Sequence, residues 1–133
     1  LQGGEYGLAV LSRWPIAHDT LVPLPVDPPQ RRSGGLTTPR IALVARIAHP
    51  SGPLVVVNAH IDAARDDRWR RQEAAQLAAL ADSLTRQPGT TVLVGGDMNA
   101  EPGSPTQALL QAGALRDAWQ RCGTGPDSLT YPV

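Results

Sequence analysis

Asp97 and Asn99 are the residues of this chain whose types and spacing first indicate chemistry. They follow the apolar run Thr91–Val94 and two glycines, Gly95 and Gly96. Side chains two residues apart on an extended strand point to the same side, so a carboxylate and an amide can converge on one ligand. A carboxylate takes a hard cation or a proton, and an amide offers both a donor and an acceptor. The pattern indicates a ligand site; its alternative is an ordinary strand-to-loop exit, where these residue types are common.

Polar residues also end a second apolar run, Leu54–Ile61, in which His60 is the last residue but one. In layered α/β folds, ligands bind where strand ends and loops meet at one rim of the sheet. If the two strands share a sheet, His60, Asp97 and Asn99 can line one pocket. Such a set suits hydrolysis of a phosphate ester: the carboxylate orients or deprotonates a water, while the imidazole and the amide donate to phosphoryl oxygens. A divalent ion would complete the site. The alternative for His60 is a structural, hydrogen-bonded role.

Two further polar residues have two possible interpretations each, and three other residues have no predicted role. Asp62 either begins the next loop or acts directly, and Asn58 either braces the site or finishes a strand edge. His18 and His49 lie in or beside predicted turns and are given no role. Cys122 has no base near it in sequence, and a nucleophile needs one, so it is predicted to be inert.

Apolar periodicity and turn residues predict the elements of the first half of the chain. A strand is predicted over Tyr6–Leu11. Residues 17–40 hold five prolines and are predicted to be a loop or an edge excursion, because proline does not suit an internal strand. The three arginines of this stretch face solvent or, in the alternative, a phosphate; they are Arg31, Arg32 and Arg40. The runs Ile41–His49 and Leu54–Ile61, joined by a short Pro/Gly turn, predict a hairpin.

The second half predicts two helices around a strand. Asp66 and Asp67 should open the first helix, since acidic residues suit a helix N-terminus. Its apolar face comprises Ala74, Leu77, Leu80, Ala81 and Leu84, and Pro88-Gly89 should stop it. The run Thr91–Val94 is typical of a strand covered on both faces. A short helix should follow, with Ser104 as cap, Pro105 first and Gly113 as its stop.

Residues Leu115–Trp119 form a short apolar segment, and the tail from Gly123 to Pro132 resembles a loop. This order predicts an α/β architecture, with helices packed on a sheet.

The bulk composition limits the classes of function. The 133 residues fit one domain, 41% of them are hydrophobic, and no run approaches the roughly 18 consecutive apolar residues of a membrane span. No signal peptide is visible, so Leu1 is interpreted as a cut end and the localisation is left unknown. Twelve acidic residues balance twelve basic ones, all arginine, which argues against strong non-specific attraction to a polyanion. A single cysteine excludes an internal disulfide framework and a multi-cysteine zinc site.

Three segments in this order resemble the endonuclease/exonuclease/phosphatase superfamily, the DNase I-like enzymes. They are Gly7–Ile16 (GLAVLSRWPI), Val56–Ile61 (VVNAHI) and Gly95–Pro102 (GGDMNAEP). The resemblance runs over nearly the whole chain, and the segments Leu115–Ala118 and Thr130–Pro132 also look like linking regions of the family. It implies a four-layer α/β sandwich of two sheets with helices outside. It further implies Mg²⁺-dependent, or sometimes Mn²⁺-dependent, hydrolysis of phosphoester bonds.

The resemblance also implies roles for the three candidate residues. His60 matches the family histidine that contacts the scissile phosphate. Asp97 matches the aspartate that positions or activates the attacking water and is interpreted as a metal ligand as well. Asn99 matches the asparagine that supports the phosphate and, in some proposals, a second metal. The substrate class is left undecided among nucleic acid, lipid and sugar phosphate.

The family pattern also has parts without a counterpart in this chain. They are an asparagine on the first strand, a metal-binding glutamate in an early strand, and a late aspartate followed by Ser-Asp-His. Residues 1–133 are therefore expected to be a partial domain, lacking N-terminal and C-terminal strands and nearly inactive alone, because a catalytic unit loses most of its rate when one part is removed. Uncovered sheet edges then predict self-association. The alternative function is a non-catalytic fragment that acts in association or regulation.

Overall fold

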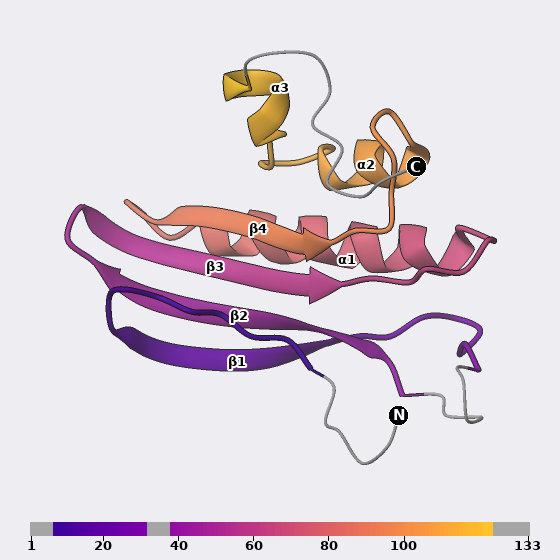
Figure 1. Ribbon diagram of the computed structural model, residues 1–133, viewed down its shortest axis with the longest axis horizontal. Helices are drawn as coiled ribbons and strands as arrows, with labels where there is room; N and C mark the ends of the chain where they lie inside the picture. Colours follow the sequence, from indigo (N-terminus) through magenta and orange to yellow (C-terminus); the bar gives the residue numbers. More distant parts are fainter. Residues whose placement is uncertain (1–6, 32–37, 124–133) are drawn as a thin grey trace.

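A four-stranded mixed sheet is the centre of the computed structural model, which describes residues 7–31 and 38–123 (Figure 1). Its strands lie in the order β1-β2-β3-β4, with bounds Ile16–Leu24, Arg40–His49, Gly52–His60 and Thr91–Asp97. The first two neighbouring pairs are antiparallel, and β3 pairs with β4 in parallel. Strands β1, β3 and β4 therefore end at the same rim of the sheet, the rim at which β2 begins.

The β2–β3 hairpin confirms the prediction made from two apolar runs and a Pro/Gly turn. Residues Val44 and Val57 are register partners, as are Ala42 and Ala59, and all four are buried. Alternate residues of β3 are buried on this face, which is the pattern of a strand with one face in the core. His60 belongs to the other set, so its side chain lies on the opposite face of the sheet.

Helix α1, Arg68–Thr85, connects β3 to β4 and packs on the buried face of the sheet. A parallel pair needs such a crossover because a tight turn cannot join two parallel strands. The predicted apolar face is confirmed: Ala74, Leu77, Ala81 and Leu84 are buried. At the N-terminus, Asp66 Oδ1 accepts the Arg68 N–H at 3.0 Å. Asp67 occupies the capping position without a side-chain bond.

The first part of the chain differs from the sequence prediction. No strand forms over Gly7–Leu11; Tyr6 lies outside the described residues. Instead, the Ala9 carbonyl accepts the Asn58 side-chain N–H at 2.9 Å, which holds this segment against the sheet face opposite α1. Segment 7–14 crosses there, and Ala45 and Ile47 on that face are buried.

Strand β1 corrects the prediction of a loop over 17–40 and agrees with its other form, an edge excursion. A sheet edge tolerates Pro23 because an outward-facing backbone N–H makes no ladder bond. Of the three arginines, Arg40 begins β2 and Arg31 is exposed, whereas Arg32 lies outside the described residues.

Strand β4 was predicted to be covered on both faces, and this is wrong. Among the described residues it is the last strand of the sheet. Val92 and Val94 are half-buried on the α1 side, and Leu93 is 54% exposed on the other side. A run of apolar residues cannot distinguish a central strand from an edge strand, because that depends on what pairs with it.

Two short helices follow β4. In α2, Pro105–Leu110, the Ser104 hydroxyl accepts the Gln107 N–H at 3.3 Å, which confirms the predicted cap. The helix ends at Leu110, before the predicted stop at Gly113. The expected apolar segment Leu115–Trp119 instead leads into α3, Ala118–Cys122, whose first N–H groups are accepted by Asp117. The predicted loop beyond Gly123 lies outside the described residues.

The resemblance to a four-layer sandwich is matched in part by this architecture. Residues 7–31 and 38–123 form one sheet with α1 on one face, and a second sheet is not among them. In these same ranges, no helix is both long and apolar enough to cross a membrane.

The fold requires a residue without a side chain at position 96, which is Gly96. Its φ of +124° is a backbone conformation that other residues rarely adopt. A Cβ at this position would clash with the carbonyl oxygen of Ala59 and lie 2.7 Å from Asn58 Oδ1. Close approach of β4 to β3, one residue before Asp97, therefore depends on this glycine.

We expect Gly96→Ala to lower the free energy of unfolding by at least about 2 kcal/mol, because it adds a backbone clash to a strained φ. Gly95→Ala is the matched control, since nothing lies within 4 Å of a Cβ there and its φ is ordinary. The Gly95→Ala variant should change stability by less than about 1 kcal/mol. Denaturant unfolding followed by circular dichroism measures both; equal effects of the two substitutions would contradict the close approach.

Candidate active site

His60 and Asp97 meet at the rim where β3 and β4 end. They are register partners in the parallel pair, each the last residue of its strand. The His60 Nε2 and Asp97 Oδ2 atoms are 3.7 Å apart, and the side chains are 30% and 61% exposed. At this exposure an ion pair adds little stability, so the arrangement is not explained by a stabilising salt bridge. The structure thus brings together the imidazole and the carboxylate that the sequence placed at two strand ends.

Asn99 joins the same rim by a turn rather than by strand periodicity. It lies beyond the end of β4 with a φ of +44°, in the left-handed region that asparagine tolerates better than most residues. Its backbone N–H donates to Asp97 Oδ1 at 2.9 Å, and its side-chain Nδ2 donates to the Ile61 carbonyl at 3.0 Å. Asn99 does lie beside Asp97, but a turn brings it there, so the strand-period reason is wrong; convergence of the two side chains on one ligand stays a prediction. Asn99 is both a turn residue and a neighbour of the other two.

Ile61 links the two strand ends. Its backbone N–H donates to the Asp97 carbonyl at 3.1 Å, and its own carbonyl accepts the Asn99 amide. The parallel pairing therefore continues one step past His60. His60, Asp97 and Asn99 are all held by main-chain geometry that depends on this residue.

Asn58 and Asp62, whose roles the sequence left open, are both placed by the structure. The Asn58 side chain bonds to Ala9 and lies beside Gly96, so it braces the segment that crosses the sheet near the site. Asp62 is 2% exposed, and its Oδ1 accepts the Ala64 N–H at 2.8 Å. Asp62 begins the loop after β3 with its carboxylate turned into the protein.

Glu73 was missed from the sequence. It lies in α1, is fully buried, and its Oε2 accepts the Asp62 N–H at 2.6 Å. The available signal was its place in the helix: Glu73 directly precedes Ala74 and lies one turn before Leu77, on the apolar face. An acid at a core position of an amphipathic helix indicates a specific polar partner.

The remaining candidates lie elsewhere. His18 is exposed on β1 and contacts the Thr20 hydroxyl. His49 ends β2, at the far end of the sheet from His60, and packs edge-on against Trp14 with ring centroids 4.2 Å apart. Cys122 is exposed on α3.

The donor atoms at the rim fit a hard cation that keeps most of its water. Asp97 Oδ2 and Asn99 Oδ1 are oxygen ligands, and Mg²⁺ is commonly bound through one or two carboxylates with waters and substrate filling the other positions. Within residues 7–31 and 38–123, no group of three or more His, Cys, Asp or Glu could hold a metal by itself. The oxygens of the rim could therefore provide only part of a metal site.

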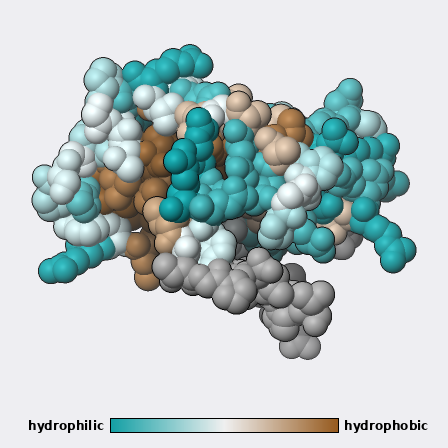
Figure 2. Space-filling model, turned by 90° about the horizontal axis from the view of Figure 1, so that it is seen from above, coloured by the Kyte–Doolittle hydropathy of each residue, from teal (hydrophilic) through white to brown (hydrophobic). Residues whose placement is uncertain are grey.

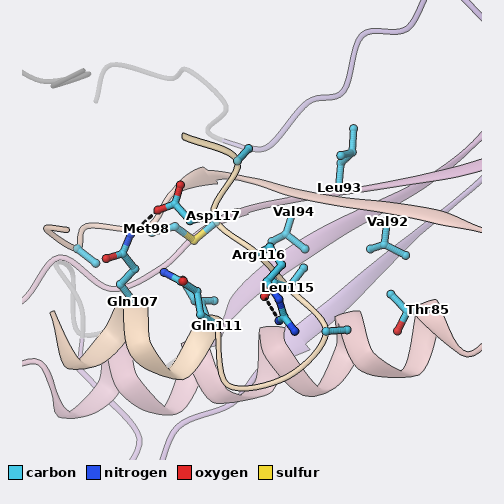
Figure 3. Close-up of a pocket in the computed structure, with 14 residues that line it drawn as sticks. Thr85, Val92, Leu93, Val94, Met98, Gln107, Gln111, Leu115, Arg116 and Asp117 are labelled. Carbon is cyan, nitrogen blue, oxygen red and sulfur yellow. Dashed lines mark hydrogen bonds between the residues drawn. The ribbon is translucent and has the colours of Figure 1, made fainter. Parts of the chain in front are cut away.

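A cavity of about 520 Å³ lies next to the exit of β4, since Met98 and Ala100 are among its lining residues (Figure 3). It is lined by apolar side chains of β4 and of the segments around α2, including Val92, Val94 and Leu115, and by Met98. Gln107 Nε2 donates to Asp117 Oδ2 at 2.8 Å at its polar end. His60, Asp97 and Asn99 do not line this cavity, so it is not the candidate site.

Comparison with solved structures shows which fold the described residues adopt. A sphingomyelinase C from Streptomyces griseocarneus matches with a TM-score of 0.58 and 18% identity, over 76% of this chain and 36% of that one. A mannosyl-6-phosphatase from Bacteroides thetaiotaomicron matches with a TM-score of 0.62 and 18% identity, over 80% and 41%. At such identities the likeness shows the fold, which is DNase I-like.

Sequence comparison gives one relative with a known name. The inositol phosphosphingolipids phospholipase C of Saccharomyces cerevisiae is 29% identical over 125 residues, which are 86% of this chain and 26% of the yeast protein. The chain thus spans about a quarter of that relative. The model of the Endonuclease/Exonuclease/phosphatase family matches residues 1–132. This chain belongs to the Endonuclease/Exonuclease/phosphatase family.

Proposed function

We propose that His60, Asp97 and Asn99 form the phosphate-binding and water-activating part of a metal-dependent phosphoester hydrolase. The observation that carries the proposal is the register of the parallel pair, which sets His60 beside Asp97 at an accessible rim. Family membership supports the reaction class, and the relatives named above act on phosphate esters by name. Because this chain spans a minority of their length, the activity of the whole protein is part of the proposal.

Each residue has a role that its atoms permit. The Asp97 carboxylate orients the attacking water and accepts its proton, since its Oδ2 is exposed while its Oδ1 is held by the Asn99 N–H. The His60 imidazole donates a hydrogen bond to a phosphoryl oxygen, where charge grows in the transition state. Asn99 stiffens the turn that carries Asp97, because its amide is bonded to Ile61.

A divalent cation, Mg²⁺ or Mn²⁺, would be held by Asp97 and Asn99 oxygens. When bound, it would supply charge stabilisation for the phosphoryl group. The substrate is a phosphate ester; the lipid phosphodiesterases among the relatives make a lipid headgroup the first to assay, with sugar phosphates and nucleic acid as the others.

We expect Asp97→Ala to lower kcat/KM for a phosphodiester by about 10³-fold or more in the full-length protein, because water activation is lost. His60→Ala should cost about 10²-fold. Asp19→Ala is the matched control, an exposed aspartate on the edge strand β1, and should stay within about two-fold of the parent. Initial rates with a phosphoester panel measure this, and full activity of Asp97→Ala would refute the role.

Removal of divalent ions tests the cofactor separately. We expect EDTA to abolish hydrolysis and added Mg²⁺ or Mn²⁺ to restore it, because rim oxygens without a cation leave phosphoryl charge unbalanced. Ca²⁺ at the same concentration is a control for general ionic effects. Hydrolysis that continues in EDTA after dialysis would contradict a metal-dependent mechanism.

The second candidate function is association, as a fold fragment that acts in assembly or regulation. It is favoured by the sheet edges: among the described residues, β1 and β4 each pair on one side only. Leu21 on β1 is 58% exposed and Leu93 on β4 is 54% exposed. Seen from the side of β4 and the short helices, hydrophobic residues gather between hydrophilic ones at the surface (Figure 2). Open edges with apolar side chains favour pairing with another chain.

We expect this chain to self-associate at micromolar concentration, giving at least twice the monomer mass of 14.1 kDa by light scattering after size exclusion. Leu93→Lys should shift the chain to monomer, because a charge on an edge strand opposes pairing. Leu11→Lys is the matched control: Leu11 is also exposed, at 93%, but lies in no strand. A parent chain that stays monomeric at high concentration would exclude edge association.

A further inference from the structure

The turn that leaves β3, residues 61–64, is tied down along its backbone by two different elements. On one side, β4 and its exit turn bond to Ile61, through the Asp97 carbonyl and the Asn99 amide. On the other side, two side chains of α1 bond to Asp62 and Ala64. Residues of the candidate site are thus bonded to one end of this turn, and side chains of α1 are bonded to the other end.

Arg70 and Glu73 are the two side chains of α1 that bond to this turn. Arg70 donates from one guanidinium nitrogen to the carbonyls of Asp62 and Ala64, both at 3.1 Å. Glu73 accepts the Asp62 N–H at 2.6 Å. The turn is closed internally as well, since Asp62 Oδ1 accepts the Ala64 N–H.

Glu73 is the informative member because its position is costly. It is 0% exposed on the helix face that otherwise carries alanine and leucine. Burial of a carboxyl group is unfavourable unless it is well hydrogen-bonded, so an apolar residue would pack there at lower cost. The N–H group that Glu73 accepts belongs to Asp62, two residues after His60. A buried acid at this place indicates that it fixes the backbone geometry after β3 rather than that it adds stability.

We propose that Glu73 is a positioning residue of the candidate site, an inference that rests on the proposed function. By holding the Asp62 N–H, it sets the path of the chain on leaving β3. That path orients His60, which precedes the turn, and the Ile61 carbonyl, which holds Asn99. Glu73 does not touch the substrate; it acts through the backbone of residues 61–62.

Amide hydrogen exchange in the ¹⁵N-labelled chain tests the positioning without requiring activity. We expect Glu73→Leu to speed exchange of the Asp62 N–H by about 10-fold or more and to broaden or shift the Asn99 side-chain amide signal. The Val57 N–H, in the hairpin, should stay within about three-fold of the parent. Glu73→Gln keeps a carbonyl oxygen as acceptor and should restore most of the protection at Asp62.

Kinetics in the full-length protein test the consequence. We expect Glu73→Leu to lower kcat by about 10- to 100-fold with KM within about two-fold, as is typical of residues that support a site from behind. Glu73→Gln should recover most of kcat. The matched control is Gln76→Leu, which also removes a hydrogen bond from α1 to a loop carbonyl, that of Pro25, and should leave kcat unchanged.

The outcomes separate this inference from the proposed function. If Glu73→Leu speeds exchange equally at Val57, or leaves Asp62 unchanged, the positioning role is wrong. It is also wrong if Gln76→Leu lowers kcat as much. A parent protein that hydrolyses no phosphoester refutes the proposed function, whereas the exchange comparison still decides whether Glu73 holds the turn. If Glu73→Leu does not fold, Glu73→Met replaces it, because its unbranched apolar side chain fits an irregular space and accepts no strong hydrogen bond. Faster exchange at Asp62 with Val57 unchanged then supports the role, and unchanged exchange at both overturns it.

Discussion

The parallel pairing of β3 with β4 is the interaction on which the candidate site depends. His60 and Asp97 are 37 positions apart in the chain, and only the register of this pair makes them neighbours. Side chains alternate between the two faces of a sheet, so a shift of one residue in β4 would turn Asp97 toward α1. Gly96 opposes such a shift, because its backbone approaches Ala59 too closely for any residue with a Cβ.

The rim combines accessible chemistry with a rigid support. The Asp97 side chain is open to solvent, whereas the main chain behind it is bonded to Ile61 and, through the turn, to α1. Backbone groups in a buried turn need partners, and here they are supplied by a carboxylate and a guanidinium instead of by secondary structure. The reactive groups can therefore be exposed without being loosely placed. Glu73 and Arg70 fix the backbone of the turn, and the consequence is that the core beneath it is not fully apolar.

The sequence predicted that the candidate residues meet better than it predicted how they are held together. The meeting of His60 and Asp97 was predictable, because each follows an apolar run and such runs end at a common rim in α/β folds. Asn99 was placed correctly for the wrong reason: a positive φ that forms a turn cannot be read from a spacing of two. Glu73 was missed because a single acid within a helical pattern is usually a solvent-facing residue. Strand β1 was partly missed because the five prolines of residues 17–40 indicate a loop, although only Pro23 lies within the strand.

The prediction that failed most clearly is that β4 is covered on both faces. The exposure of β4 on one face also leaves the candidate site accessible. On the sheet face opposite α1, segment 7–14 covers Ala45 and Ile47 of β2. That cover does not extend across the sheet: Leu93 of β4 is left 54% exposed. His60 and Asp97 project from the same face, at the ends of β3 and β4. Apolar surface in water costs about 25 cal/mol per Å², so the exposure of Leu93 does not stabilise the described residues on their own. A ligand at the rim and a second sheet at this edge, the two occupants proposed above, would both lie near Leu93 and Asp97, because these residues project from the same face of β4.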